Sequence, residues 1–207
     1  MSRHRIPAVF IRGGTSKGVF FHDRDLPAPG MERDSVFLNV IGSPDPYQRQ
    51  LNGMGGGISS LSKAVIIEPS KRDDADIDFT FAQVAVDRPE VVYTNTCGNL
   101  SSAVGPFAVD EGLVEPVDGE VLVRVFNTNT SKIYHARFNA EDGQAVETGS
   151  FEIPGVAGTG AKIKLDFLDP GGAITGNLLP SGATVDELTV PGLGRVEASF
   201  IDATNAI

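Results

Sequence analysis

The chain has 207 residues, 41% of them hydrophobic and 21% charged, which is typical of a folded globular protein and excludes a largely disordered one. No run of 18 or more apolar residues occurs, so we expect no membrane-spanning helix. The formal net charge of −10 argues against a nucleic-acid-binding surface, and no block of Lys and Arg opposes this conclusion.

The cysteine content indicates the compartment. The single cysteine, Cys97, cannot form an internal disulfide and fits a reducing environment. The basic N-terminal segment lacks the apolar run of a signal peptide, so we expect a cytoplasmic protein. The histidines are scattered and interpreted as surface or structural residues: His4, His22 and His135. We expect no metal site, because no cluster of His, Asp or Glu has the spacing of metal ligands.

The N-terminal segment predicts a β-hairpin. Ile6–Arg12 and Val19–His22 are strand-like runs, and a wide glycine-rich turn separates them. Such a turn can present backbone N–H groups and the Ser16 hydroxyl to an anion, although a plain turn is the alternative. The apolar spacing then predicts a helix over Arg33–Ile41 and a further helical turn at Pro46–Leu51.

A second glycine-rich segment, Asn52–Lys63, precedes a predicted strand over Ala64–Ile67. It is not a P-loop, since it lacks the Gly-Lys-Ser/Thr order and a strand follows where a helix should. Its glycines permit close approach of the backbone to a ligand. Lys63 stands where the loop meets the apolar strand, so desolvation would lower its pKa and make it a candidate base. The alternative is a solvated lysine at a strand end.

Further strands are predicted by alternating apolar residues. Asp76–Val86 is predicted as one strand with a slip in the alternation near Ala82. Gly119–Asn127 and Lys132–Asn139 are predicted to pair with each other, and Ala161–Leu168 is a later strand.

The segment around Cys97 leads into a predicted helix over Ser101–Glu111, with Asn99 or Ser101 as its N-cap. The positive field at the start of a helix favours the thiolate of a nearby cysteine. The free N–H groups of the first turn can also bind a substrate carboxylate. The alternative is a buried, inert cysteine.

Three ordered motifs together resemble the PrpF family. They are Arg-Gly-Gly-Thr-Ser-Lys-Gly at 12–18, Gly-Gly-Gly-Ile-Ser-Ser-Leu-Ser-Lys at 55–63 and Asn-Thr-Cys-Gly-Asn at 95–99. The resemblance covers the whole chain but roughly the first half of a family member. It implies an α+β, diaminopimelate-epimerase-like fold, in which two similar halves each curve a mainly antiparallel sheet around a central helix. The active site of that fold lies between the halves.

This resemblance also implies a domain division. Residues 1–140 would form the first epimerase-like domain, and residues 141–207 would begin a second, incomplete one. An unfinished sheet leaves unpaired edge groups, and we expect uncovered apolar faces at 151–153, 163–167 and 196–200. We therefore expect a homo-oligomer, or a partner chain that supplies the second half.

The activity implied by the resemblance is a cofactor-independent isomerase. It would move a proton and a double bond in an unsaturated di- or tricarboxylate such as 2-methylaconitate. Lys63 matches the lysine that moves the proton, and Cys97 matches the active-site cysteine. The implied substrate-binding residues are Ser16, Thr15, Lys17, Gly56, Gly57, Ser59, Ser60, Gly98, Asn99 and Asn205. A second hypothesis is a non-catalytic fragment, or one chain of a two-chain enzyme, that binds a polycarboxylate only.

Overall fold

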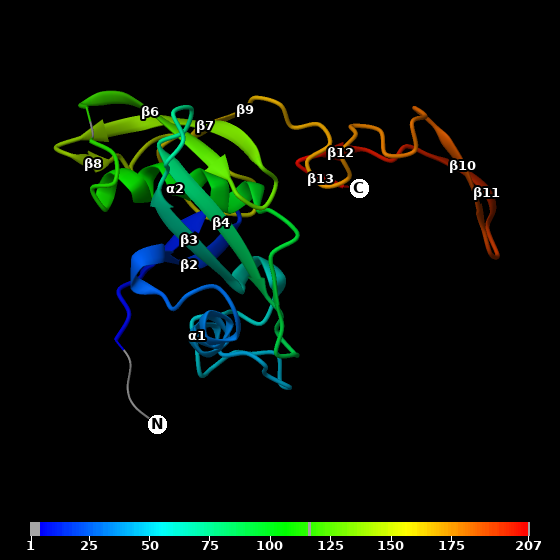
Figure 1. Cartoon of the computed structure of the whole chain (residues 1–207), viewed down its shortest axis with the longest axis horizontal. Coiled ribbons are helices and arrows are strands. Elements are labelled where there is room, and N and C mark those ends of the chain that lie inside the picture. Colours follow the sequence, from blue (N-terminus) through cyan, green and yellow to red (C-terminus); the bar gives the residue numbers. More distant parts are fainter. Residues whose placement is uncertain (1–4, 116, 207) are drawn as a thin grey trace.

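The structure is a computed structural model that describes residues 5–115 and 117–206. Its main feature is a curved, mixed nine-stranded sheet (Figure 1). The strands, in sheet order, are β1 (Val9–Gly13), β2 (Ser16–His22), β3 (Lys63–Pro69), β4 (Ile77–Val84), β6 (Gly119–Asn127), β7 (Lys132–Glu141) and β8 (Gln144–Ala145), with β5 (Val91–Val92) beside β4 and β9 (Lys164–Phe167) beside β7. Within the described sheet, β2–β3 and β4–β6 are parallel and the other pairings are antiparallel.

Each parallel pairing is joined by a helical crossover. Helix α1 (Met31–Ile41) connects β2 to β3, and α2 (Gly98–Asp110) lies between β4 and β6. Crossovers of this kind are almost always right-handed. Strands β2 and β4 run in opposite directions, and both crossovers lead toward the same edge of the sheet. Two right-handed crossovers of this kind must therefore place α1 and α2 on opposite faces of the sheet. The sheet accordingly curls around α2, and α1 packs against the other face of the sheet (Figure 1).

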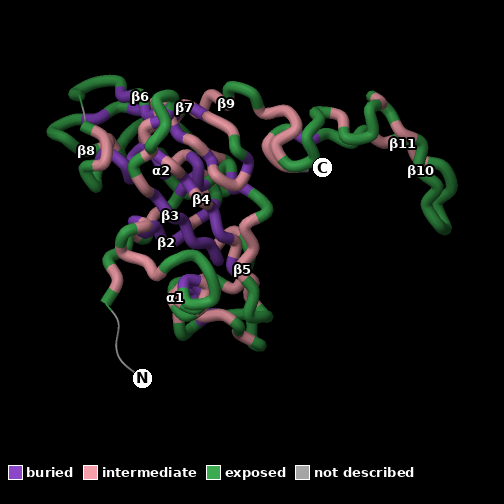
Figure 2. The backbone as a smooth tube through the Cα atoms, in the orientation of Figure 1, coloured by how far each residue is buried: buried purple, intermediate pink, exposed green. Residues whose placement is uncertain are grey.

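Two separate cores follow from this arrangement. One contains α2 residues such as Phe107, packed against Phe20 and Phe81, while the other contains Phe37 of α1 with Val19 and Ala82. The central strands are therefore buried on both faces, as the purple segments of Figure 2 show. The strand slip predicted near Ala82 is wrong, because the register of β3 with β4 is continuous and consecutive residues simply enter different cores.

Two local predictions are also corrected. The hairpin turn is not wide: Gly13 pairs with Ser16, so only Gly14 and Thr15 form the turn, and Gly14 has a positive φ of 52°. The segment 46–51 is not helical. There the Asp45 carboxylate accepts from the backbone N–H groups of Tyr47, Arg49 and Gln50, and this fixes a turn instead.

The two described histidines occupy different settings. His22 is buried, and its Nε2 lies 3.1 Å from Glu111 Oε2, which supports a structural role. His135 is half-buried on β7, and His4 lies outside the described residues. Among the residues that the structure describes, no group of three or more His, Cys, Asp and Glu side chains could hold a metal ion. No helix in this part of the chain is long and apolar enough to cross a membrane.

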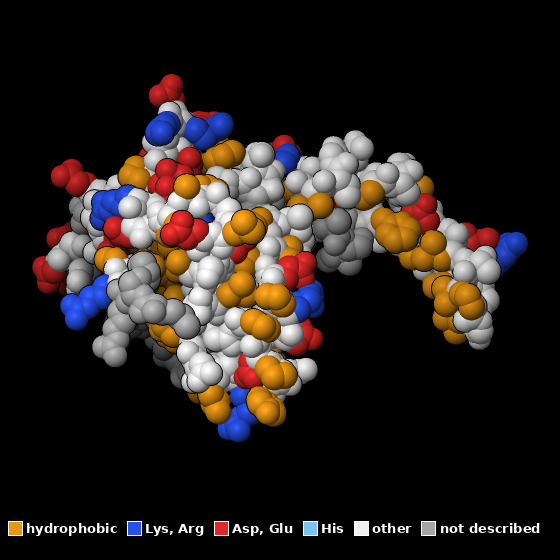
Figure 3. All heavy atoms as spheres, turned by 60° about the horizontal axis from the view of Figure 1, so that its bottom comes forward, with side chains coloured by type: hydrophobic (Ala, Val, Ile, Leu, Met, Phe, Trp, Pro, Cys, Tyr) orange, Lys and Arg blue, Asp and Glu red, His pale blue; other side chains and the backbone are white. Residues whose placement is uncertain are grey.

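The C-terminal part extends away from the sheet (Figure 1). It contains a hairpin of β10 (Asp186–Val190) and β11 (Gly194–Ala198), followed by the short pair β12 (Asp202–Ala203) and β13 (Asn205–Ala206). Apolar side chains gather on this arm in Figure 3. Its exposed apolar residues include Leu188, Val190, Leu193, Phe200 and Ile201.

The uncovered apolar face expected at 163–167 is not found. Strand β9 pairs with β7, and its Leu165 and Phe167 pack against the core around α2. The Phe167 ring lies 5.3 Å from that of Tyr134 between centroids. Phe151 and Phe200, in the other two expected faces, are 44% and 36% exposed.

Candidate active site

Cys97 lies at the start of the central helix. It is the N-cap of α2, and its Sγ accepts from the backbone N–H of Leu100 at 3.5 Å. The predicted caps, Asn99 and Ser101, are therefore wrong: the helix begins at Gly98, and the Ser101 hydroxyl donates to the Cys97 carbonyl inside the first turn. The thiol is 8% exposed and unpaired with any other cysteine. The positive end of the helix favours a negative charge on this sulfur.

The glycines of the first motif let the hairpin approach this helix start. A Cβ added at Gly13 would lie 2.5 Å from the Asn99 carbonyl oxygen, and one added at Gly14 would lie 2.2 Å from Asn99 Oδ1. Asn99 Oδ1 also accepts from the backbone N–H of Thr15 at 3.2 Å. The backbone of the hairpin turn therefore packs directly against the first turn of α2.

Strand register then places two more polar side chains beside Cys97. Ser16 begins β2 and Lys63 begins β3, and both point to the face covered by α2, since Phe20 and Val65 of the same strands enter that core. The Cys97 Sγ lies 3.9 Å from the Ser16 hydroxyl oxygen. Ser16 is 3% exposed and Lys63 7%, so the solvated lysine considered from the sequence is not observed.

The Lys63 amine has a defined environment. Its Nζ donates to Gln83 Oε1 at 2.7 Å and lies 4.8 Å from the centroid of the Phe81 ring. Burial lowers the pKa of Lys63 below its ordinary value, and the neighbouring Cys97 partly offsets this effect. An amine with a lowered pKa, next to a thiol and a hydroxyl, can exchange protons with a bound ligand.

The second glycine-rich loop is shaped by a buried amide. Gln50 is 1% exposed; its Oε1 accepts from the Gly57 N–H and the Ser62 hydroxyl, each at 2.8 Å, and its Nε2 donates to Ser43 Oγ. Ser59 and Ser60 follow this loop in the 3₁₀ helix η2 (Ser59–Leu61), immediately before Lys63.

Several predicted binding residues surround the buried trio of Ser16, Lys63 and Cys97. Thr15, Gly98 and Asn99 are exposed at the contact of hairpin and helix. A Cβ added at Gly98 would meet nothing within 4 Å, so the space in front of the helix start is open. Gly56, Gly57, Ser59 and Ser60 are exposed or half-buried on the neighbouring loop.

Lys17 does not join this group. Side chains alternate along β2, so Lys17 lies on the face opposite Ser16. There its Nζ lies 5.2 Å from the centroid of the Phe10 ring. A residue next to a functional one in a strand points away from it, and this argues against Lys17 as a ligand of the same site.

Asn205 reaches the site indirectly. Its side-chain Oδ1 accepts from the Thr96 N–H at 3.3 Å, and its Nδ2 donates to the Thr96 carbonyl at 3.5 Å. The Asn205 side-chain amide, which was predicted to bind substrate, therefore forms hydrogen bonds with Thr96, the residue before Cys97. These bonds connect Thr96 to the C-terminal arm.

Replacing Asn205 with alanine should loosen this connection. A typical hydrogen bond contributes about 0.5–1.5 kcal/mol, so the Thr96 amide should exchange with solvent roughly 2- to 12-fold faster in Asn205→Ala. Hydrogen-exchange NMR on the 207-residue chain measures this directly. The control Asn52→Ala, at an exposed position, should leave the Thr96 rate unchanged, and equal Thr96 rates in both variants would contradict the predicted role of Asn205.

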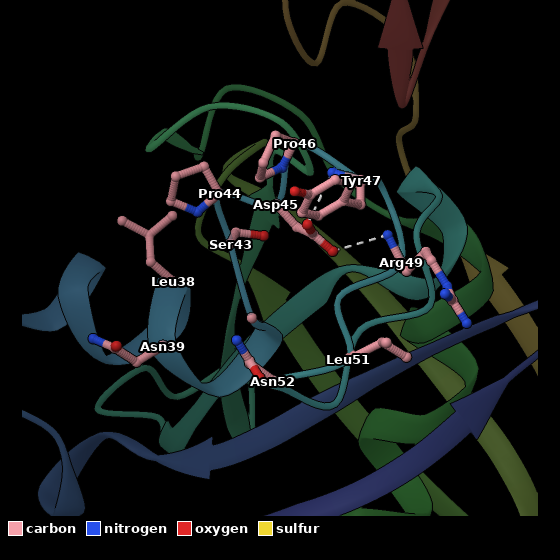
Figure 4. Close-up of a pocket in the computed structure, with 11 residues that line it drawn as sticks. Leu38, Asn39, Ser43, Pro44, Asp45, Pro46, Tyr47, Arg49, Leu51 and Asn52 are labelled. Carbon is pink, nitrogen blue, oxygen red and sulfur yellow. Dashed lines mark hydrogen bonds between the residues drawn. The ribbon is translucent and has the colours of Figure 1, made fainter.

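The hollow in Figure 4 has none of the trio among its lining residues. It has a volume of about 510 Å³ and is formed by the end of α1 and the segment that follows, including Leu38, Asp45, Tyr47 and Leu51. The Asp45 carboxylate, drawn with its bond to the Arg49 backbone, shapes its wall. No Lys, Cys or His lines it, so we assign it no catalytic chemistry.

Two residues of the site were missed from the sequence, Gln83 and Gln50. Side chains two residues apart in a strand point to the same face, so Gln83 lies on the face of Phe79 and Phe81, which is also the face of Lys63. A prediction that used this alternation could therefore have found it. Gln50 carries no such signal, because its burial depends on a loop with a positive φ of 51°.

The curved sheet around α2 is similar to the fold of racemases and epimerases, and it brings Lys63 of β3 next to Cys97 at the start of α2. The chain is similar in structure to a hydroxyproline epimerase from Agrobacterium vitis, with a TM-score of 0.55 at 13% identity, covering 93% of this chain and 47% of that one. A probable proline racemase from Agrobacterium radiobacter gives a TM-score of 0.53 at 14% identity, covering 93% of this chain and 48% of that one. Likenesses at this identity support the fold alone.

The chain belongs to the PrpF family, because the family model described as PrpF protein matches residues 3–207. It is 45% identical to a 2-methyl-aconitate isomerase of Cupriavidus necator over 96% of this chain and 53% of that protein. It is 46% identical to a 3-methylitaconate isomerase of Eubacterium barkeri over 97% of this chain and 52% of that protein. A crystal structure of methylitaconate-delta-isomerase has a TM-score of 0.83 at 45% identity, covering 97% of this chain and 51% of that one. The chain thus spans about half the length of the relatives that it matches.

Proposed function

We propose that this chain supplies the catalytic half of a cofactor-independent isomerase that acts on an unsaturated di- or tricarboxylate. Lys63 is the proton-transferring base, and Cys97 is its partner in the site. The observation that carries the proposal is the convergence of the Lys63 amine, the Cys97 thiol and the Ser16 hydroxyl at the start of α2. The names of the relatives, which include a 4-oxalomesaconate tautomerase of Pseudomonas putida at 48% identity over 90% of this chain and 51% of that protein, support this substrate class.

The proposed chemistry fits these groups. A proton leaves a saturated carbon next to a double bond that is conjugated with a carboxylate, and a proton returns at the far carbon of that double bond, so the double bond moves without oxidation or reduction. The neutral Lys63 amine accepts the first proton, and its lowered pKa makes the neutral form available nearer to physiological pH. The backbone N–H groups at Gly98 and Asn99, with the Ser16 hydroxyl, stabilise the negative charge that develops on the substrate.

The remaining predicted binding residues take supporting roles in this proposal. Thr15, Gly56, Ser59 and Ser60 surround the substrate carboxylates with N–H and hydroxyl donors. Gly57 donates its N–H to Gln50 Oε1 and shapes the loop instead. Asn205 acts mainly by holding Thr96 before the cysteine, and Lys17 is the weakest member of the predicted set.

We also propose a diaminopimelate-epimerase-like organisation in two halves, divided near residue 140. The curved sheet around α2 supports the first half. Strand β9 of the second part pairs with β7 of the first, so the two parts share one sheet edge. In this organisation the site is completed by a second half or by a partner chain, and the exposed apolar side chains of the arm are compatible with such a neighbour.

Isotope exchange tests the proposed function. The chain replaces the matching half of the Eubacterium barkeri 3-methylitaconate isomerase, and the chimera is incubated in D₂O with 2-methylaconitate, 3-methylitaconate or 4-oxalomesaconate. We expect solvent deuterium to enter the substrate as the double bond moves, and much slower exchange with the isolated chain. Saturable substrate binding without exchange by a folded chimera would instead support the second hypothesis, a non-catalytic polycarboxylate-binding chain.

A further inference from the structure

Gln83 makes the closest polar contact to the candidate base. It is the cross-strand partner of Lys63 in the antiparallel pair of β3 and β4, on the face covered by α2. Its Oε1 accepts from Lys63 Nζ at 2.7 Å. Its Nε2 donates to the carbonyl oxygens of Ser62 at 2.9 Å and Ser59 at 3.1 Å, with a longer contact of 3.4 Å to Val84.

These partners fix the orientation of the amide. Carbonyl oxygens can only accept, so the Gln83 NH₂ group must face Ser59 and Ser62. The Gln83 oxygen must then face the lysine, since the reversed amide would bring its oxygen against two carbonyls and its NH₂ group against an amine. The side chain is therefore a rigid link between the start of β3 and the turn that carries Ser59 and Ser60.

The charge of the acceptor matters as much as its position. A carboxylate at this distance would stabilise the protonated amine, whereas an amide oxygen accepts from the amine without adding charge. The groups facing Lys63 are Gln83 and Phe81 from β4 and the Cys97 thiol from the start of α2; of these, Cys97 is titratable. Among the described residues, no Asp or Glu makes an ion pair with Lys63.

We propose that Gln83 is a positioning residue that holds the Lys63 amine with a neutral acceptor and couples it to the Ser59–Ser62 turn. This proposal rests on the proposed role of Lys63 as the base. It assigns Gln83 two tasks, to aim the amine toward the space beside Cys97 and to keep the amine neutral until it accepts a proton.

The substitution Gln83→Glu tests the electrostatic task, because it keeps the shape and the acceptor and adds a charge. We expect the pKa of Lys63 to rise by about 1–3, the usual effect of a nearby opposite charge. The measurement is an NMR titration of the 207-residue chain with ¹³C-labelled lysine, in which Lys63→Met identifies the Lys63 resonance. Gln144→Glu adds the same charge at an exposed position of β8 and should leave the titration unchanged.

The substitution Gln83→Met tests the positioning task, because it keeps the length and removes both the acceptor and the donors. We expect faster hydrogen exchange in the Ser59–Ser62 turn and no upward shift of the Lys63 titration. In the chimera, Gln83→Glu should move the rising limb of the pH–rate profile to higher pH by the same amount as the NMR titration.

The outcomes separate the two proposals. An unchanged Lys63 titration in folded Gln83→Glu, or unchanged exchange of the turn in Gln83→Met, overturns the role of Gln83 whether or not the chimera is active. A shifted titration in an inactive chimera supports the contact and refutes the isomerase instead.

Discussion

Isomerisation by the chimera should fall by about 10²–10⁴-fold when Lys63 is replaced with methionine, because a lost general base costs this much. Methionine fills a similar volume, and its thioether can contact the Phe81 ring, so the variant should remain folded. The unsubstituted protein should become more active as the pH rises toward the pKa of Lys63, because the base must be neutral. Burial places that pKa below the ordinary value for lysine. Steady-state kinetics with 3-methylitaconate measure both effects.

The control is Lys71→Met, which removes a charge from an exposed lysine and should keep full activity. A Lys63→Met variant that retains activity within tenfold of the parent would show that another group moves the proton. Cys97 would then be the next candidate, because its thiol faces the same space.

Replacing Gly13 with alanine should destabilise the chain by about 1–3 kcal/mol, the usual cost of overpacking. The new methyl group would lie 2.5 Å from the Asn99 carbonyl oxygen and 3.0 Å from the Leu100 Cα, and both are backbone atoms that cannot turn aside. The hairpin must therefore move away from α2, and Ser16 moves with it. Urea denaturation of the 207-residue chain measures the loss.

The matched control for this substitution lies at the same junction. At Gly98 an added methyl group meets nothing within 4 Å. Gly98→Ala should be as stable as the parent or gain about 0.4–1 kcal/mol, since alanine restricts the unfolded chain more than glycine does. Equal stability of the two alanine variants would disprove the close-approach explanation for Gly13.

Much of the fold followed from local patterns. The strand predicted at Gly119–Asn127 has the same bounds in the structure, and the helix predicted from Arg33 begins two residues earlier. The error at Ala82 has a tertiary cause, because alternation fails as a guide where both faces of a strand are buried. The turn of the first hairpin was judged too wide because the glycines were attributed to the turn, whereas Gly13 and Gly18 belong to strands packed against α2.

The site was predicted less completely than the fold. The three motifs identified Ser16, Lys63 and Cys97, and the structure brings these residues together. Local sequence could not show that Lys17 faces away, since this depends on which core the strand faces. The N-cap of α2 was predicted at the wrong residue for a similar reason. Cysteine is not a common N-cap, and Asn99, which N-cap preferences favour, uses its side-chain oxygen to accept from the Thr15 N–H instead.

The two parallel crossovers also bear on the order of folding. Ser16 and Cys97 are 81 residues apart in sequence, and α1, β3 and β4 lie between them along the chain. Contacts between distant residues form slowly, because the entropy of closing long loops is lost before the contacts stabilise the chain. The β6–β7 hairpin needs only a short turn and can form early. We therefore expect the trio of Ser16, Lys63 and Cys97 to be among the last parts to become ordered, so that a partly folded chain has its hairpins before these three side chains meet.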